Sequence, residues 1–276
     1  MTRELVRAKE RADPLSRSDA RSRGRVQPRG RREPAGRGPD RPPRVRGLTV
    51  SVAPGEVVAL LGPNGAGKTT SLLAMVGLVP LLAGVVDVLG APLGRRRPHQ
   101  VARAGVLLVP DDRGIFYGLT VREHLRLAAR RPDARREGAV LDRFPVLRNL
   151  EGRKAGLMSG GEQQMLAIAK ALLAEPKVLI IDEMSLGLAP KIVQEMLPAI
   201  RDLAQEDGIG LILVEQHIEL ALSIADRGVI LNHGRVVLTG AAADLLRDRY
   251  LVEAAYFGAD EFGHDETDPD RVPALG

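Results

Sequence analysis

The sequence contains no cysteine and no tryptophan, and only 3% of its residues are aromatic. Without cysteine there is no disulfide, no zinc–thiolate site and no thiol nucleophile. Long hydrophobic runs are also missing, because the longest uncharged stretch, residues 69–86, is interrupted by Gly77, Pro80 and Gly84. That stretch has about the shortest length that could cross a bilayer, and it opens with three hydroxyl residues. We therefore do not expect the chain itself to form a pore.

Apolar residues are scarce at the N-terminus. Residues 1–44 hold only five large apolar side chains and no continuous apolar region of the kind found in secretory signals. A cytosolic location is therefore expected. The same residues are rich in Arg, Pro and Gly, which predicts a disordered basic tail. The alternative is a basic arm that touches lipid or nucleic acid.

Positive charge is concentrated in this tail. Residues 1–46 carry fifteen Lys and Arg against six Asp and Glu, whereas the other 230 residues carry 25 against 29. The net charge of +5 thus comes from the tail, and the body is mildly acidic. A basic face for nucleic acid would have to lie in the tail, which has no aromatic residue to stack on bases. No nucleic-acid partner is expected.

Ordered structure is expected over about residues 45–258, followed by an acidic C-terminal tail at 259–276. Alternating or continuous apolar residues predict strands, 3.6-residue patterns predict helices, and Pro132 and Pro145 interrupt a helical stretch at 120–157. Strands are predicted at 48–52, 57–61, 85–89, 105–109, 178–181 and 210–214, helices from 68 and over 160–174, 190–206 and 219–225, and a hairpin at 229–238. Strands that alternate with helices indicate an α/β fold with a mainly parallel sheet.

A glycine-rich segment directly follows the apolar strand at 57–61. It reads Gly62-Pro63-Asn64-Gly65-Ala66-Gly67-Lys68-Thr69 and fits the pattern of a phosphate-binding loop. Glycines let backbone N–H groups converge on a polyanion, and the following helix adds the positive end of its dipole. Lys68 can reach the β and γ phosphates, and the Thr69 hydroxyl can bind Mg²⁺. The segment, with Thr70, predicts a site for ATP and Mg²⁺.

Two acids end the apolar strand at 178–181. Asp182 is placed to hold Mg²⁺ through water, and Glu183 can polarise the attacking water as a general base. Acids at the end of a strand can also mark nothing more than the start of a turn. Because the chain already has a phosphate loop, we interpret Asp182 as part of the metal site and Glu183 as catalytic.

A second glycine-containing segment opens the helix predicted over 160–174. Ser159 and Glu162 fit a capping box, which by itself does not require Gly160 or Gly161. Bare backbone at a helix N-terminus is also an anion site. One chain would then hold two phosphate-binding loops, so the second can serve the nucleotide of another subunit.

With these motifs the chain resembles the ATP-binding cassette (ABC) ATPases, and is similar to the LivF-type subunit of branched-chain amino-acid importers. The resemblance covers about residues 47–258. It implies a P-loop NTPase fold of the ABC type, with a mainly parallel core, a small antiparallel β part and an inserted helical subdomain at about 113–158. The LivF likeness rests on Val109-Pro110-Asp111, Ile115-Phe116, Leu119-Thr120-Val121 and residues 185–190.

The resemblance also assigns roles to residues. Ser159-Gly160-Gly161-Glu162-Gln163 would be the signature loop, which contacts the γ-phosphate bound by the partner cassette. Val214-Glu215-Gln216-His217 would be the switch region after a predicted strand, with His217 as the sensor of the γ-phosphate, although a lone histidine is more often structural. Residues 185–190 would form the D-loop, and 226–240 the closing hairpin.

Three features depart from the family's pattern. Asp111 stands where relatives carry Gln or Glu; it would touch the water shell of Mg²⁺ and relay motion of the transport domains, with a shorter reach. Met184 replaces a proline, which we expect to matter little. Relatives stack adenine on an aromatic residue before the phosphate loop, and this chain has none before Phe116. Either ATP binding is weak and poorly selective for adenine, or Arg44 or Arg46 stacks on the base.

The resemblance implies an ATPase subunit that energises a membrane importer for branched-chain amino acids or related small polar solutes. The expected partners are a second cassette, LivG-like or another copy, two permease subunits and, through them, a solute-binding protein. The chain would bind peripherally to the cytoplasmic face of the membrane. The alternative is a non-transport ABC ATPase of translation or DNA repair, but those carry two cassettes or long coiled coils, which this chain lacks. An unrelated P-loop kinase would not need the Ser159–Gln163 loop.

Overall fold

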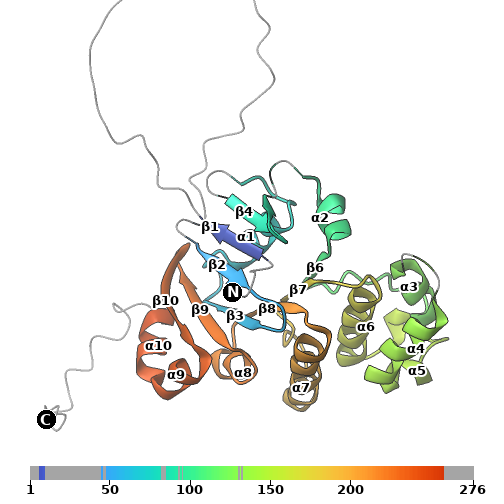
Figure 1. The fold of residues 1–276 in the computed structure, drawn as a ribbon. Helices are drawn as coiled ribbons and strands as arrows, with labels where there is room; N and C mark the ends of the chain where they lie inside the picture. Colours follow the sequence, from blue (N-terminus) through green and yellow to red (C-terminus); the bar gives the residue numbers. More distant parts are fainter. Residues whose placement is uncertain are drawn as a thin grey trace, which may run out of the picture.

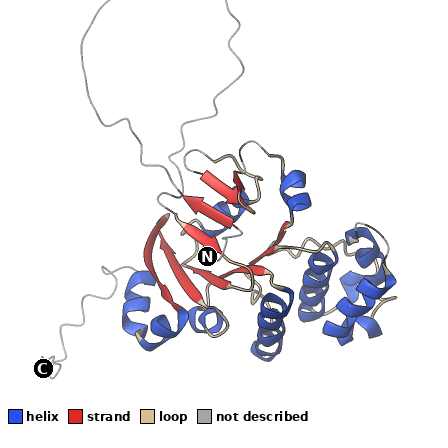
Figure 2. Ribbon diagram, viewed as in Figure 1, coloured by secondary structure: helices blue, strands red, loops and turns tan. Residues whose placement is uncertain are grey.

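The structure is a computed structural model that describes residues 6–9, 45, 48–81, 85–92, 94, 96–129, 131 and 133–257. Two β-sheets and the helices that cover them form the described part of the chain (Figure 1, Figure 2). Several expectations fall outside it: the predicted tails at 10–44 and 259–276, the break at Pro132, and the adenine contact by Arg44 or Arg46.

The larger sheet has six strands in the order β10-β9-β3-β8-β7-β6. Neighbouring strands from β9 to β6 are parallel, and β10 closes the edge in the antiparallel direction. The strands are β3 (Val57–Leu61), β6 (Val106–Val109), β7 (Val178–Asp182), β8 (Gly210–Glu215), β9 (Arg227–Asn232) and β10 (Arg235–Ala241). The central strands β3, β7 and β8 are buried along their whole length, as continuous apolar sequence requires in a sheet covered on both faces.

A smaller antiparallel sheet lies above the larger one in Figure 1, in the order β2-β1-β4-β5. It comprises β1 (Val6–Lys9), β2 (Val50–Val52), β4 (Val85–Val88) and β5 (Ala91–Pro92). The prediction that residues 1–44 are disordered throughout is therefore wrong for Val6–Lys9, which pairs with β2 on one side and β4 on the other. The alternation of apolar and charged residues here is only four residues long, and this strand depends on partners more than 40 residues away in the chain.

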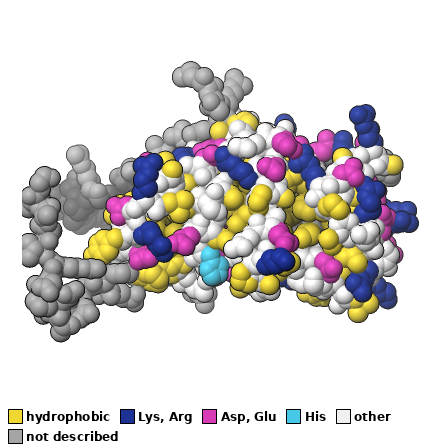
Figure 3. Space-filling model, turned by 90° about the horizontal axis from the view of Figure 1, so that it is seen from below, with side chains coloured by type: hydrophobic (Ala, Val, Ile, Leu, Met, Phe, Trp, Pro, Cys, Tyr) yellow, Lys and Arg dark blue, Asp and Glu magenta, His cyan; other side chains and the backbone are white. Residues whose placement is uncertain are grey.

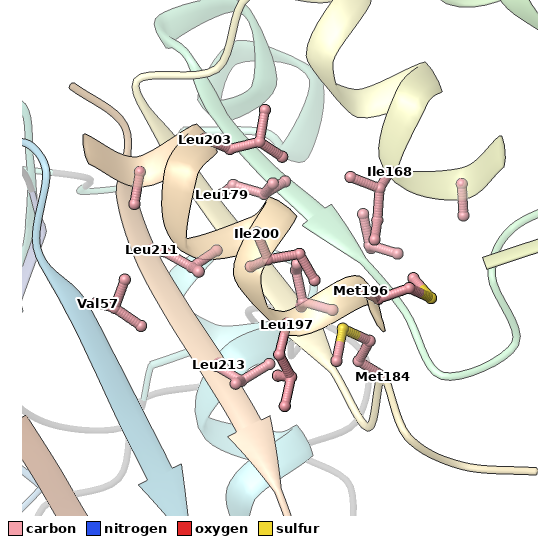
Figure 4. Close-up of a cluster of buried hydrophobic side chains, with 14 of the residues drawn as sticks. Val57, Ile168, Leu179, Met184, Met196, Leu197, Ile200, Leu203, Leu211 and Leu213 are labelled. Atoms are coloured by element: carbon pink, nitrogen blue, oxygen red, sulfur yellow. The ribbon is translucent and has the colours of Figure 1, made fainter. Parts of the chain in front are cut away.

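Successive residues of β3 pack alternately into two hydrophobic cores. Val57 and Leu61 face one core, formed with α6 (Gly160–Leu173), α7 (Pro190–Asp207) and the C-terminal helices. Figure 4 shows α7 packing its apolar side chains on β7 and β8 within this core. Val58 and Leu60 face the other core, with α1 (Lys68–Met75), α2 (Pro98–Ala104) and the smaller sheet. The parallel sheet is thereby fixed between two layers.

A group of helices is inserted between β6 and β7 and lies at one end of the molecule (Figure 1). Thr120 and Glu123 form a capping box at the first helix, Asp133 caps the second, and Pro145 opens the third. The helices are α3 (Val121–Ala128), α4 (Ala134–Arg143), α5 (Pro145–Asn149) and a 3₁₀ turn at Ala155–Leu157. They pack on α6, which begins immediately after them.

After α7 the chain forms β8 and the short helix α8. The β9–β10 hairpin and two further short helices follow. The hairpin turn, His233-Gly234, has positive φ at both residues, as a tight two-residue hairpin demands. The helices are α8 (Ile218–Leu222), α9 (Ala242–Arg247) and α10 (Arg249–Phe257). Asn232 at the end of β9 donates to the carbonyl oxygens of Ala255 and Tyr256, which fixes the end of α10 to the sheet.

Candidate functional site

The glycine-rich loop lies between β3 and α1, which begins at Lys68. Gly65 and Gly67 have φ angles of 82° and 103°, in the left-handed region that other residues rarely adopt. A Cβ atom on Gly62 would lie 2.1 Å from the carbonyl oxygen of Leu231, and Gly234 N donates to Ala66 O at 2.9 Å. The β9–β10 hairpin therefore packs against one side of the glycine-rich loop. The backbone N–H groups of that loop remain available to bind an anion.

Lys68 is a buried cation, 4% exposed, at the start of α1. Its Nζ donates to the carbonyl oxygens of Gly62 at 2.7 Å and Pro63 at 3.2 Å, and lies 4.0 Å from Glu183 Oε1. Burial lowers the pKa of Lys68, and the nearby carboxylates oppose that shift. The loop thus holds a positive charge beside its own backbone, as a phosphate-binding loop requires.

Asp182 has the properties of a residue that binds a hard cation. It is 3% exposed, and its Oδ1 has no hydrogen-bond partner among the described residues. Burial raises the pKa of Asp182 to about 6, although its hydrogen bond with Thr69 acts in the opposite direction. A buried, unpaired oxygen next to a hydroxyl fits Mg²⁺, which protein sites usually hold by one or two carboxylates together with substrate phosphates.

Protein groups alone do not form a metal site here. In the part of the chain that the structure describes, no cluster of three or more His, Cys, Asp or Glu side chains could hold a metal ion. The donor set of Thr69 and Asp182 therefore suits a cation that also binds phosphate oxygens. Asp111, the third predicted ligand, is exposed after β6; its charge adds to the burial that raises the pKa of Asp182.

Glu183, the predicted general base, follows β7 with a φ angle of 48°. Its N–H donates to Val214 O at 2.9 Å, and its Oε1 accepts from Gln216 Nε2 at 2.8 Å. Parallel pairing of β7 with β8 places Asp182 opposite Val214, so Glu183 and Gln216 meet at the same edge of the sheet. The sequence analysis placed Gln216 in the switch region but did not predict its bond to Glu183; its place directly after β8 is the signal that could have found it.

Gln216 is in turn held by the C-terminal helix α10. Tyr256, which is 7% exposed, donates its hydroxyl to Gln216 O at 3.2 Å. His217, the predicted γ-phosphate sensor, is the exposed residue that caps α8 at the same edge. The edge thus brings together Lys68, Asp182, Glu183 and the segment around His217.

Glu215 belongs to the same predicted switch region, and its contact with Ser185 was not predicted. It is 1% exposed, and its carboxylate accepts from Ser185 N at 2.9 Å and from Ser185 Oγ at 2.7 Å. Burial raises the pKa of Glu215, and the bonds from Ser185 oppose that shift. Glu215 therefore fixes the loop that follows Glu183.

The structure contains the predicted capping box at the start of α6. Ser159 Oγ accepts from Glu162 N at 3.3 Å, and Ser159 N donates to Glu162 Oε2 at 2.7 Å. The two glycines have packing partners of their own, since added Cβ atoms would lie 3.1 Å from Leu188 Cδ2 and 2.6 Å from Ile192 Cγ2. Close approach of the segment at 188–192 thus explains glycine at Gly160 and Gly161.

The two glycine loops do not form one site within the chain. No hydrogen bond or ion pair in the described part of the structure joins residues 159–163 to residues 62–70. Ser159 is exposed, and α6 lies apart from α1 in Figure 1.

Residues 45–185 match the family described as ABC transporter, which is just over half of the chain. The chain belongs to the ABC transporter family. It is 40% identical over 213 residues to the high-affinity branched-chain amino acid transport ATP-binding protein BraG of Pseudomonas aeruginosa, covering 74% of this chain and 91% of that protein. It is 39% identical over 194 residues to a probable branched-chain amino acid transport ATP-binding protein LivF of Archaeoglobus fulgidus, covering 69% of this chain and 82% of that one.

The ABC fold is also evident among solved structures. The cbiO1 subunit from Clostridium perfringens aligns with a TM-score of 0.72 over 95% of this chain and 98% of its own, at 22% identity. The predicted fold, a mainly parallel core with a small antiparallel sheet, is confirmed, and so is the prediction of an ATP-hydrolysing cassette. No helix in the described ranges combines the length and apolar content needed to cross a bilayer.

Proposed function

We propose that this ABC ATPase is the subunit that energises a membrane importer for branched-chain amino acids or related small polar solutes. The observation that carries the proposal is the separation of its two anion-binding loops, which leaves the exposed Ser159 loop free to serve a second cassette. The two relatives named for branched-chain amino acid transport support the solute class. The chain would act at the cytoplasmic face of the membrane.

In this proposal, different residues of the site bind the phosphates, hold the metal ion and accept a proton. The backbone of residues 62–70 and Lys68 would bind the phosphates, and Thr69, Asp182 and Asp111 would hold Mg²⁺. The bound metal ion supplies positive charge that offsets the negative charge of the phosphates. Glu183 accepts the proton of the attacking water, and His217 contacts the γ-phosphate.

A second cassette, LivG-like or another copy of this chain, would complete each site. Residues 159–163 would then contact the nucleotide that the neighbour's phosphate loop binds, through the N-terminus of α6. ATP would thus be held between two chains, and hydrolysis would depend on their pairing.

Permease contact fits the exposed apolar residues of the helical insertion. Phe116, Tyr117 and Leu157 are 63%, 62% and 71% exposed, and they are neighbours because Gly156 N donates to Tyr117 O. Figure 3 shows that hydrophobic side chains are also exposed between scattered charges on the lower face. Grouped apolar residues on a surface mark contact with a protein partner. A pair of permease subunits and, through them, a solute-binding protein complete the proposed importer.

The proposal is tested by purifying the tagged full chain from membranes of its own host and identifying the proteins that accompany it. We expect two permease subunits and a second cassette. In vesicles that contain this assembly, leucine, isoleucine or valine with their binding protein should stimulate ATP hydrolysis, whereas lysine should not. Recovery with ribosomes or DNA-repair proteins instead would contradict the proposal.

A further inference from the structure

One arginine side chain joins three segments around the proposed ATPase site. Arg113 lies in the loop after β6, two residues beyond Asp111. Its Nη1 donates to Gln163 Oε1 at 2.9 Å and its Nε to Gln164 Oε1 at 3.2 Å, both on α6. Its Nη2 donates to Leu186 O at 3.4 Å, in the loop after Glu183. A single guanidinium therefore contacts the Asp111 loop, the first turns of α6 and residues 185–189.

The backbone at Arg113 has a conformation that non-glycine residues seldom adopt. Arg113 has a φ of 64°, and its N–H donates to Pro110 O at 2.9 Å in a tight turn. Glycine adopts this left-handed conformation freely, whereas residues with a Cβ are disfavoured there. Gly114, the next residue, also has positive φ. An arginine in such a turn is best explained by what its guanidinium binds.

The acceptors of Arg113 are buried and oriented. Gln163 and Gln164 are 8% and 2% exposed. Gln163 Nε2 donates to the carbonyl oxygens of Ala155 and Met158, so its oxygen is turned toward Arg113. Gln164 Nε2 has no hydrogen-bond partner in the described structure, which leaves the bond from Arg113 as the polar contact of its side chain.

The guanidinium also lies close to the start of α6. A Cβ on Gly160 would be 3.4 Å from Arg113 Nη2, so the arginine lies against the residue that follows Ser159. A second bond, from Lys170 Nζ to Gly114 O at 2.6 Å, ties the same loop farther along α6. The loop after β6 is thus attached to α6 at two points.

We propose that Arg113 is a positioning residue for ATP hydrolysis, which holds the Asp111 loop, the Ser159 loop and residues 185–189 in one arrangement. A guanidinium suits this task because its five donors are fixed in one plane and can bond several acceptors at once, which an ammonium cannot do in the same geometry. Arg113 acts on the neighbour's nucleotide only through Ser159, so the inference rests on the proposed role of that loop.

The test uses the full chain in the assembly with which it purifies, and ATP with Mg²⁺ as the probe. Arg113→Ala should lower kcat about tenfold or more, while KM for ATP and the ATP affinity of the isolated chain stay within about twofold. Arg113→Lys keeps the charge but should recover less than half of the lost rate. The matched control is Arg247→Ala, which removes an exposed arginine from α9 and should leave kcat unchanged.

A second pair of variants checks the mechanism. Gln164→Met removes one acceptor at similar volume, and adding it to Arg113→Ala should slow hydrolysis no further, because both changes break the same link. If Arg113→Ala does not fold, Arg113→Lys and Gln164→Met carry the same comparison.

Two results would overturn the inference: a kcat for Arg113→Ala within about twofold of wild type, or a parallel loss of ATP affinity in the isolated chain. Either would leave the proposed function intact. A wild-type chain that hydrolyses ATP at full rate as an isolated monomer would overturn the proposed function, and the role of Arg113 with it.

Discussion

At the scale of single residues, the end of β7 decides the chemistry. Glu183 follows Asp182 directly, and its carboxylate lies at the sheet edge between Lys68 and Gln216. Its backbone N–H donates to Val214 O of the neighbouring strand, which fixes the position of the backbone that carries the side chain. Substitution of Glu183 therefore tests the role of its carboxylate, and substitution of Gln216 tests the role of the carboxylate's position.

Glu183→Gln should retain ATP binding but slow hydrolysis by about 100-fold or more, since the amide cannot accept the proton of water. ATPase rates and nucleotide affinity of the assembled transporter are the measurements. Glu195→Gln, at an exposed position on α7, is the matched control and should hydrolyse ATP at the wild-type rate. Turnover near normal in Glu183→Gln would refute the assignment.

Gln216→Leu should lower kcat about tenfold, because the amide that holds the Glu183 carboxylate at 2.8 Å is lost. The affinity for ATP should stay within about twofold, since Gln216 positions the base and is not expected to bind the nucleotide. Steady-state kinetics separate the two quantities. A change in KM with normal kcat would show that Gln216 contributes to binding instead.

At the scale of elements, the N-terminus of α6 caps its own helix and, in the proposed function, would also contact the neighbour's nucleotide. The capping box satisfies the backbone of its first turn, and Ser159 is exposed. A substitution of Ser159 affects both the helix cap and the proposed contact. Comparing a bulky with a small replacement side chain separates the two effects.

Ser159→Arg should abolish ATP-driven pairing of cassettes, because a bulky side chain would occupy the place of the neighbour's phosphate. ATP binding to the isolated chain should be almost unchanged. Ser159→Ala, which loses the cap at a cost of about 1 kcal/mol, is the control and should still pair. Sedimentation of Glu183→Gln chains with ATP measures pairing; equal loss of ATP binding by the monomer would show that the loop acts within its own chain.

The start of β9 is anchored by Asp226, which pairs with Arg201 of α7 and accepts from Val57 N of β3. The hydrogen bonds from Arg201 hold the pKa of Asp226 below its ordinary value of 3.8. Because the folded pKa is the lower one, the stabilisation is present above about pH 4 and is lost as the pH falls through the folded pKa.

Asp226→Asn should therefore reduce the free energy of unfolding at pH 7 by about 1 kcal/mol, a modest value because solvent screens the pair. The difference between variant and wild type should shrink as the pH falls toward about 3. Urea unfolding at several pH values measures it. A difference that stays constant with pH would exclude the charge as its cause.

At the scale of the whole molecule, no Phe, Tyr or Trp precedes the phosphate loop to stack on the nucleotide base. The first aromatic residue, Phe116, lies beyond the phosphate loop and is 63% exposed on the helical insertion. The phosphates and Mg²⁺ would then carry most of the binding free energy. Arg44 or Arg46 is the alternative contact for adenine.

The wild-type chain should bind GTP within about fivefold of ATP if no ring stacks on the base, since one such stack is worth about 1–3 kcal/mol. If an arginine stacks instead, replacing both Arg44 and Arg46 by alanine should weaken ATP binding. Calorimetric titration of both nucleotides distinguishes the two versions. Tight, adenine-selective binding that survives the double substitution would refute both.

The phosphate loop, the acids that end β7 and the capping box of α6 were readable from sequence because each is set by residues adjacent in the chain. Spacing of glycines, an apolar run and a Ser–Glu pair define backbone conformation locally, and the structure has these elements close to the predicted bounds. The break at Pro145 is also local, because proline fixes its own backbone and opens α5.

Only the tertiary structure decided the contacts between distant segments. Val6–Lys9 becomes a strand because β2 and β4 offer partners on both sides, whereas its own alternation of four residues is too short to predict a strand. Gln216 meets Glu183, and Glu215 meets Ser185, because parallel pairing of β7 with β8 brings their ends to one edge. Arg113 contacts α6 across a sequence separation of 50 and 51 residues. Local sequence sets backbone conformation, whereas these bonds depend on which strands pair and which surfaces pack.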